Sequence, residues 1–129
     1  MSTIITFYTA ANDDAAERGP GKDSVGFGDF DVFASLEEWE SFLLDRPLDD
    51  VDGPEQVNDE ESPLILGFLP KLTNALARAD AATLAGVATK WVAARAADGE
   101  KVDPAQARRI LTDLAALARS RRPLYCHVA

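Results

Sequence analysis

The sequence predicts an α+β fold, with a small sheet that includes N-terminal and C-terminal strands and is packed by about four helices. β-Branched and aromatic residues gather near both ends of the chain, as is typical of strands. Between them, apolar residues recur at helical spacing after residues that commonly begin helices. A length of 129 residues is usual for one domain, so residues 1–129 are interpreted as a single domain.

The first elements are expected before residue 34. The cluster of β-branched and aromatic residues from Ile4 to Tyr8 predicts the first strand. Residues 12–24 are polar and interrupted by glycine and proline, which predicts a loop or a frayed turn of helix. Residues 25–33 mix apolar residues with glycine and aspartate, and we interpret them as a short irregular strand.

A helix is expected from Ser35 to about Asp45. Ser35 is followed three residues later by Glu38, which is the spacing of a capping box at a helix N-terminus. The apolar residues that recur here at helical spacing are Leu36, Trp39, Phe42 and Leu43. The helix should end near Asp45, because Pro47 disfavours helical geometry at Arg46.

The second half begins with a strand and two helices. Residues 63–69 form a short apolar run bounded by prolines, which favours a buried strand. Pro70 suits the first position of a helix. Asp80 then caps a longer helix, whose apolar stripe fades at Asp98 and Gly99, a pair typical of a helix end.

The last elements are a helix and a terminal strand. Asp103 and the following Pro104 predict the start of the helix. Arginines gather at its C-terminus, where cations interact favourably with the helix dipole. Residues 124–129 follow Pro123 and are interpreted as a strand that pairs with the first strand, which would place both ends of the chain in one sheet.

The negative charge is concentrated in the first half of the chain. Residues 1–62 carry 17 of the 22 acidic side chains and three basic ones, a net charge of −14, whereas residues 63–129 carry +5. Residues 46–62 are expected to form a long acidic loop, and a long loop in a small domain is often functional. We select its acids as candidate partner-binding residues: Asp49, Asp50, Asp52, Glu55, Asp59, Glu60 and Glu61.

Catalytic and metal-binding patterns are not found. The only cysteine and the only histidine are Cys126 and His127, and neighbouring residues of a strand point to opposite faces, so they should not form a catalytic pair. Two adjacent ligands do not make a zinc site. Residues 48–59 do not match a calcium loop, and the sequence around Lys22 does not match a phosphate-binding loop. The lack of these patterns favours a protein that is not an enzyme, with no catalytic, metal or cofactor-binding residues.

Two groups of residues have ordinary structural interpretations. Glu37, Glu38 and Glu40 are expected on a solvated helix face, because no pattern marks two of them as a catalytic pair. Trp39 and Trp91 are expected in the core, because each lies on an apolar stripe.

The location and the partner classes follow from composition. A single cysteine, with no signal peptide and no apolar run long enough for a membrane span, favours a cytoplasmic protein. The net charge of −9 disfavours nucleic acids and anionic membranes as partners. We therefore expect a protein-interaction module, similar to an immunity protein or an inhibitor, that presents its acidic surface to a basic partner.

Three alternatives remain at this level. The arginines of the last helix could neutralise the acidic half within the chain; they are Arg108, Arg109, Arg119, Arg121 and Arg122. The chain could bind a small molecule or a divalent metal without a recognisable catalytic motif, in a pocket lined by Tyr8, Trp91 and Tyr125. It could also form a homo-oligomer in which acidic and basic halves meet across subunits.

The C-terminal part of the chain resembles a known group of sequences. The segments LTNALARADAATLAGVATKW and LAALARSRRPLYCHV are similar to small uncharacterised actinobacterial proteins that end in an LYCWV-like strand. The matching residues are Leu76, Leu84, Ala88, Trp91, Leu114, Leu117, Leu124, Tyr125, Cys126 and Val128. The resemblance covers about 60 residues and has His127 where those proteins carry an aromatic residue. It implies an α+β fold with a terminal strand and implies no site residues.

Overall fold

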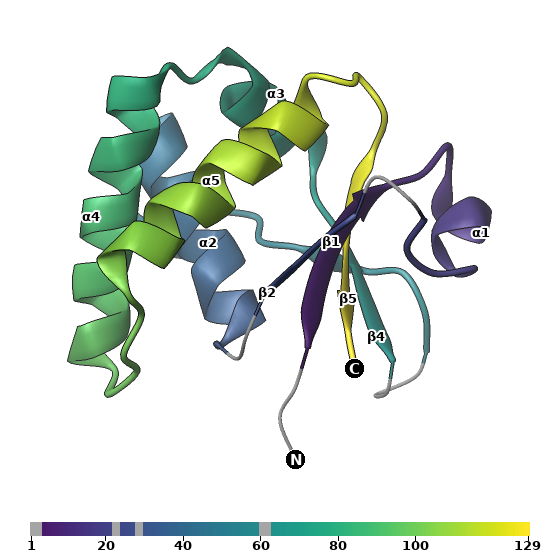
Figure 1. Cartoon of the computed structure of the whole chain (residues 1–129), viewed down its shortest axis with the longest axis horizontal. Coiled ribbons are helices and arrows are strands. Elements are labelled where there is room, and N and C mark those ends of the chain that lie inside the picture. Colours follow the sequence, from purple (N-terminus) through teal and green to yellow (C-terminus); the bar gives the residue numbers. More distant parts are fainter. Residues whose placement is uncertain (1–3, 22–23, 28–29, 60–62) are drawn as a thin grey trace.

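The computed structural model describes residues 4–21, 24–27, 30–59 and 63–129, and it describes only the backbone of residues 25 and 27. In chain order the elements are β1 (Ile5–Thr9), α1 (Asp13–Ala16), β2 (Val25–Phe27), α2 (Val32–Leu44), the 3-10 turn η1 (Leu48–Asp50), β3 (Glu55–Gln56), β4 (Leu64–Gly67), α3 (Pro70–Arg78), α4 (Ala81–Ala97), α5 (Pro104–Ala118) and β5 (Leu124–Val128). Figure 1 shows α2 to α5 on one side of the sheet and the short α1 on the other. The α+β class is confirmed.

The sheet is antiparallel, and its strand order is β2-β1-β5-β4-β3. The strands nearest the two ends of the chain are neighbours, and their register places Ile5 opposite Val128 and Thr9 opposite Leu124. The predicted pairing of the first and last strands is therefore confirmed. On its other side β5 pairs with β4, where Leu64 also lies opposite Val128.

Three helices begin where the sequence predicts. The Asp80 carboxylate accepts a hydrogen bond from the Thr83 N–H at 2.7 Å, and this bond lowers the pKa of Asp80. The Asp103 carboxylate accepts from the Gln106 N–H at 3.0 Å and caps α5 in the same way. Pro70 is the first residue of α3, as predicted. At the end of α4, Gly99 has a φ of +84°, the left-handed backbone conformation that favours glycine.

The start of α2 differs from the prediction. The helix begins at Val32, within the range predicted as an irregular strand, because the Asp31 carboxylate accepts the Ala34 N–H at 3.1 Å and caps it there. The predicted cap, Ser35, is fully buried inside the helix, and its hydroxyl accepts a hydrogen bond from the Trp91 indole N–H at 3.0 Å. The capping-box interpretation of Ser35 and Glu38 was therefore wrong, and the real cap lies four residues earlier.

The main core lies between the sheet and α2 to α5 and has an aromatic centre. Trp39 and Trp91 are fully buried, and their rings meet at a centroid distance of 5.0 Å and an interplanar angle of 70°. Phe30 packs edge-on against Trp91, at 5.1 Å between ring centroids. Phe7 of β1 contacts both Trp39 and Phe68, at 6.0 Å in each case. Edge-to-face packing of this kind adds to the hydrophobic stabilisation of the core.

A second, smaller cluster lies on the opposite face of the sheet. Tyr8 and Tyr125 are opposite each other on β1 and β5, with ring centroids 5.9 Å apart. The Tyr8 hydroxyl donates to the Ala16 carbonyl oxygen at 2.7 Å, and the Tyr125 hydroxyl donates to Asp13 at 2.8 Å. Burial raises the pKa of Tyr8 to about 12, because the charged phenolate would be poorly solvated there. These two bonds attach α1 to the sheet.

Candidate functional site

The acidic segment, residues 46–62, contains more regular structure than the loop that the sequence predicts. In its described part, 46–59, the chain makes the turn η1 and then the short edge strand β3, which pairs with β4. The Val57 N–H donates to the Ile65 carbonyl oxygen at 2.9 Å and extends this pairing. The Asn58 side chain accepts from the Ile65 N–H at 3.0 Å. The segment is thus attached to the sheet along its second half.

A buried carboxylate holds the middle of the acidic segment. Glu40 of α2 is 1% exposed, and its two oxygens accept the N–H groups of Asp52 at 2.9 Å and Gly53 at 3.3 Å. Gly53 has a φ of +75°, and a Cβ at this position would approach Glu37 Cγ to 3.3 Å. The backbone conformation therefore favours glycine here, and a larger residue would also displace the Glu37 side chain. The prediction that Glu40 lies on a solvated face was wrong.

The candidate residues of the segment point mostly to solvent. Asp49 and Asp50 lie in η1, Glu55 lies on β3, and all three side chains are exposed, as are those of Asp52 and Asp59. The predicted site residues Glu60 and Glu61 fall outside the described residues. The structure thus places the described candidates on one continuous stretch of surface chain, and it gives them no enclosed pocket.

The acidic segment makes one ion pair among the described residues, between Asp52 and Lys71 at 3.7 Å. Both side chains are more than half exposed, at 53% and 59%, so this pair is worth little in stability. The alternative of internal neutralisation is not supported, because the five arginines proposed for it form no ion pair with an acid anywhere in the described parts of the chain. Arg119 instead donates to the carbonyl oxygens of Ala77 and Ala79, at 3.2 and 3.0 Å.

A buried ionic network joins α2 to α4, and the sequence reasoning missed it. Arg95 of α4 is 2% exposed and donates two parallel hydrogen bonds to Glu38, at 2.8 and 2.9 Å. It also contacts Asp98 at 2.6 Å and Glu100 at 3.2 Å. The hydrogen bond to Glu38 raises the pKa of Arg95, because it stabilises the charged guanidinium. Glu38 was also predicted to be solvated, and it is 6% exposed.

The network also orders the start of α2. Both oxygens of Glu100 accept the Asp31 N–H, at 2.9 and 3.1 Å, so the loop after α4 reaches the residue that caps α2. A signal for this site exists in the sequence: Arg95 continues the stripe of Leu84, Ala88 and Trp91 at steps of four, three and four residues. A charged residue on an apolar stripe indicates a buried partner of opposite charge.

The lone cysteine and histidine do not form a reactive pair. Cys126 is fully buried in the main core, where burial raises the pKa of its thiol above the ordinary range. His127 follows it on the opposite face of β5 and is half-buried. A protonated, inaccessible thiol is a poor nucleophile.

The predicted pocket of Tyr8, Trp91 and Tyr125 does not form. Trp91 belongs to the core on the helical side of the sheet, and the two tyrosines belong to the cluster on the other side. In the residues that the structure describes, no group of three or more His, Cys, Asp or Glu side chains is arranged to hold a metal ion. None of the helices in the described ranges is long and apolar enough to cross a bilayer.

Comparison with family models, with curated proteins and with solved structures finds no match to this chain. The resemblance of the C-terminal residues to small actinobacterial proteins therefore stays a prediction.

Replacing Glu40 with glutamine should loosen the acidic segment. Glutamine has one side-chain oxygen, so one of the two N–H groups of Asp52 and Gly53 loses its acceptor. We expect the free energy of unfolding to fall by about 1–3 kcal/mol. Hydrogen exchange at these two amides, measured by NMR, should accelerate. Glu55→Gln is the matched control, because it removes the same charge from an exposed side chain of the same segment. Equal protection of both amides in E40Q and E55Q would contradict the role of Glu40.

Proposed function

We propose that this chain is a protein-interaction module, similar in kind to an immunity protein or an inhibitor, whose acidic segment binds a basic protein. The observation that carries the proposal is the solvent exposure of the carboxylates of Asp49, Asp50, Glu55 and Asp59. Among the described residues these four make no ion pair, although the chain carries arginines elsewhere. Because no basic side chain of the chain pairs with these carboxylates among the described residues, they are suited to bind the cationic groups of another protein.

The backbone of the acidic segment supports the same proposal. Its middle is attached to α2 through the buried Glu40, and its end is attached to the sheet through Val57 and Asn58. A segment that is already ordered loses little conformational entropy when a partner binds. Charge complementarity then accelerates association and selects for partners of the opposite sign.

Neutralising three carboxylates of the segment should weaken capture of the partner. The variant Asp49→Asn, Asp50→Asn, Asp52→Asn keeps side-chain size while removing three negative charges. Used as bait in a lysate of its native cells, the unaltered chain should retain a basic protein, and the triple variant should bind that protein about tenfold more weakly at low salt. Titration of the purified pair by calorimetry at two salt concentrations measures the difference.

The matched control is Asp14→Asn, Glu17→Gln, Asp113→Asn, which removes the same charge from surfaces outside the acidic segment. Asp14 and Glu17 lie in or beside α1, on the opposite side of the sheet from α5, which carries Asp113. This control should retain the partner at nearly the original affinity. Equal weakening by both triple variants would show that only net charge matters, and a partner insensitive to salt would contradict an acidic docking surface.

Sizing of the chain alone addresses the homo-oligomer. If the chain forms a larger species in low salt than in high salt, the acidic segment binds the arginines of a second copy. That result would contradict the proposal of an external partner.

A further inference from the structure

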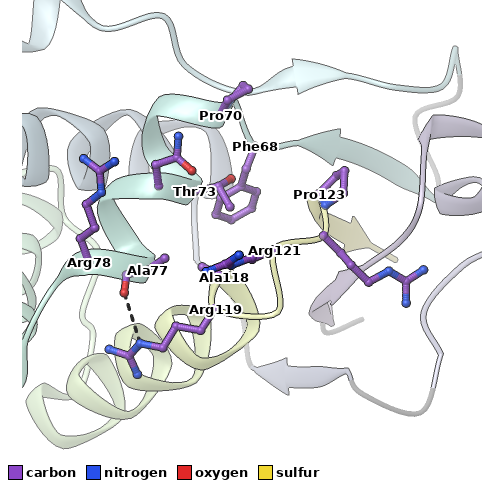
Figure 2. A pocket seen from close by; sticks show the side chains of 11 residues that line it. Phe68, Pro70, Thr73, Ala77, Arg78, Ala118, Arg119, Arg121 and Pro123 are labelled. Atoms are coloured by element: carbon purple, nitrogen blue, oxygen red, sulfur yellow. Dashed lines mark hydrogen bonds between the residues drawn. The ribbon is translucent and has the colours of Figure 1, made fainter.

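The described residues line an open pocket of about 670 Å³ between α3 and the chain that joins α5 to β5. One wall is the face of α3 that carries Thr73, Asn74 and Ala77. The opposite wall is Ala118 at the end of α5 and the arginines that follow it. Figure 2 shows Phe68 and Arg121 between these two walls. A volume of this size is in the range of pockets that bind small molecules.

The rim of the cavity is strongly basic, although the chain as a whole is acidic. Four of its eleven lining residues are arginines: Arg78, Arg119, Arg121 and Arg122. Arg119 has a structural role, because it donates hydrogen bonds to carbonyl oxygens at the end of α3. In the described part of the chain, the other three guanidinium groups contact no carboxylate. These guanidinium groups therefore remain available to an anion that enters the pocket.

Arg121 occupies a backbone position that favours glycine. Its φ is +64°, in the left-handed region, where a side chain costs about 1 kcal/mol relative to glycine. The turn itself is local, since the Arg121 N–H donates to the Ala118 carbonyl oxygen at 3.3 Å. Glycine would make this helix end at lower cost. A strained arginine that faces a cavity indicates a use for its guanidinium, because strain of this kind gathers at functional positions.

We infer that this cavity binds a small organic phosphate, with the phosphate on the arginine rim and the apolar part of the ligand against Phe68, Ala118 and Pro123. Guanidinium groups bind phosphate oxygens through paired hydrogen bonds. A phosphomonoester, which carries nearly two negative charges at neutral pH, gains more from a basic rim than a carboxylate, which carries one. Thr73 and Asn74 add polar groups on the α3 side. This site shares no residue with the acidic segment, and either can fail without the other.

Phenyl phosphate, inorganic phosphate and phenol are the probes, titrated into the labelled chain and followed by NMR. Phenyl phosphate should shift the amides of residues 73–78 and 118–123 with a dissociation constant of about 1 mM or below. Inorganic phosphate should bind the same residues more weakly, and phenol should not saturate. Arg121→Gly should weaken phenyl phosphate about tenfold while leaving the melting temperature unchanged or higher, because glycine relieves the backbone strain.

Arg109→Gln is the matched control, since Arg109 is an exposed arginine of α5 outside the cavity lining. It should leave the affinity for phenyl phosphate within about twofold. Equal affinity of R121G and the unaltered chain would overturn the site, as would the absence of saturable shifts at roughly ten times the expected dissociation constant. Equal binding of phenol and phenyl phosphate would show an apolar cavity without anion recognition and would also overturn it.

Discussion

Arg95→Met is expected to lower the free energy of unfolding by about 3–5 kcal/mol. Methionine fills much of the space of the arginine stem but leaves the Glu38 carboxylate, whose side chain is 8% exposed, without its cation. An unpaired charge in the core has no water to solvate it, so its full desolvation penalty remains. A domain of this size is stable by only about 5–15 kcal/mol, so the loss is a large part of the total. Urea denaturation followed by circular dichroism measures it.

Two further variants separate this loss from simple loss of an ion pair. Lys71→Met removes the exposed partner of Asp52 and should cost below about 1 kcal/mol. The double variant Glu38→Leu, Arg95→Met replaces both buried charges by apolar groups and should recover part of the stability lost in the single variant. If the double variant is less stable than Arg95→Met alone, Glu38 stabilises the fold through more than its charge pairing with Arg95. A single-variant loss no larger than that of Lys71→Met would contradict the buried pair.

Trp91→Ala should cost about 3–5 kcal/mol, because it leaves a large cavity at the centre of the aromatic cluster. The Trp91 ring contacts Trp39 and Phe30 and is fully buried, so the surrounding helices cannot close the space without moving. The loss should appear as a fall of at least about 10 °C in melting temperature, measured by calorimetry.

Phenylalanine substitutions at the two tryptophans give a sharper test of the geometry. Trp91→Phe deletes the indole N–H that donates to the buried Ser35 hydroxyl, whereas the Trp39 N–H has no hydrogen-bond partner among the described residues. Both changes remove similar volume. Trp91→Phe should therefore cost about 1 kcal/mol more than Trp39→Phe. The reverse order would show that the indole of Trp39, not that of Trp91, makes the stabilising hydrogen bond.

Most of the elements could be predicted because their signals are local. Asp80, Asp103 and Pro70 begin helices through contacts within one turn, so the sequence around them is sufficient. The terminal strands were also predictable, since each is a compact cluster of β-branched and aromatic residues. The prediction of the start of α2 failed because Asp31, which caps the helix, lies one turn before the predicted cap Ser35, and both residue types are common at helix N-termini.

The interior polar residues could not be assigned from helical spacing. Glu38 and Glu40 flank Trp39 on α2 and resemble solvated acids in a one-dimensional pattern. Their burial depends on Arg95, 57 residues after Glu38, and on the backbone of Gly53, 13 residues after Glu40. The cavity at Arg121 is a similar case, because it brings α3 beside the residues that follow α5. Contacts between distant segments decide these environments, and the periodicity of α2 alone does not reveal them.

The central place of β5 sets the order in which this protein can finish folding. The strand pairs with β1 on one side and β4 on the other, and its register joins Ile5 to Val128. During synthesis on the ribosome, β1 is made before all the other strands, and its partner β5 is made last. During that interval β1 and β4 each have an open edge capable of pairing with other chains. Pairing between strands so far apart in the sequence is also slow. Until β5 is made, the helices synthesised between β1 and β5 are the elements that can cover the incomplete sheet.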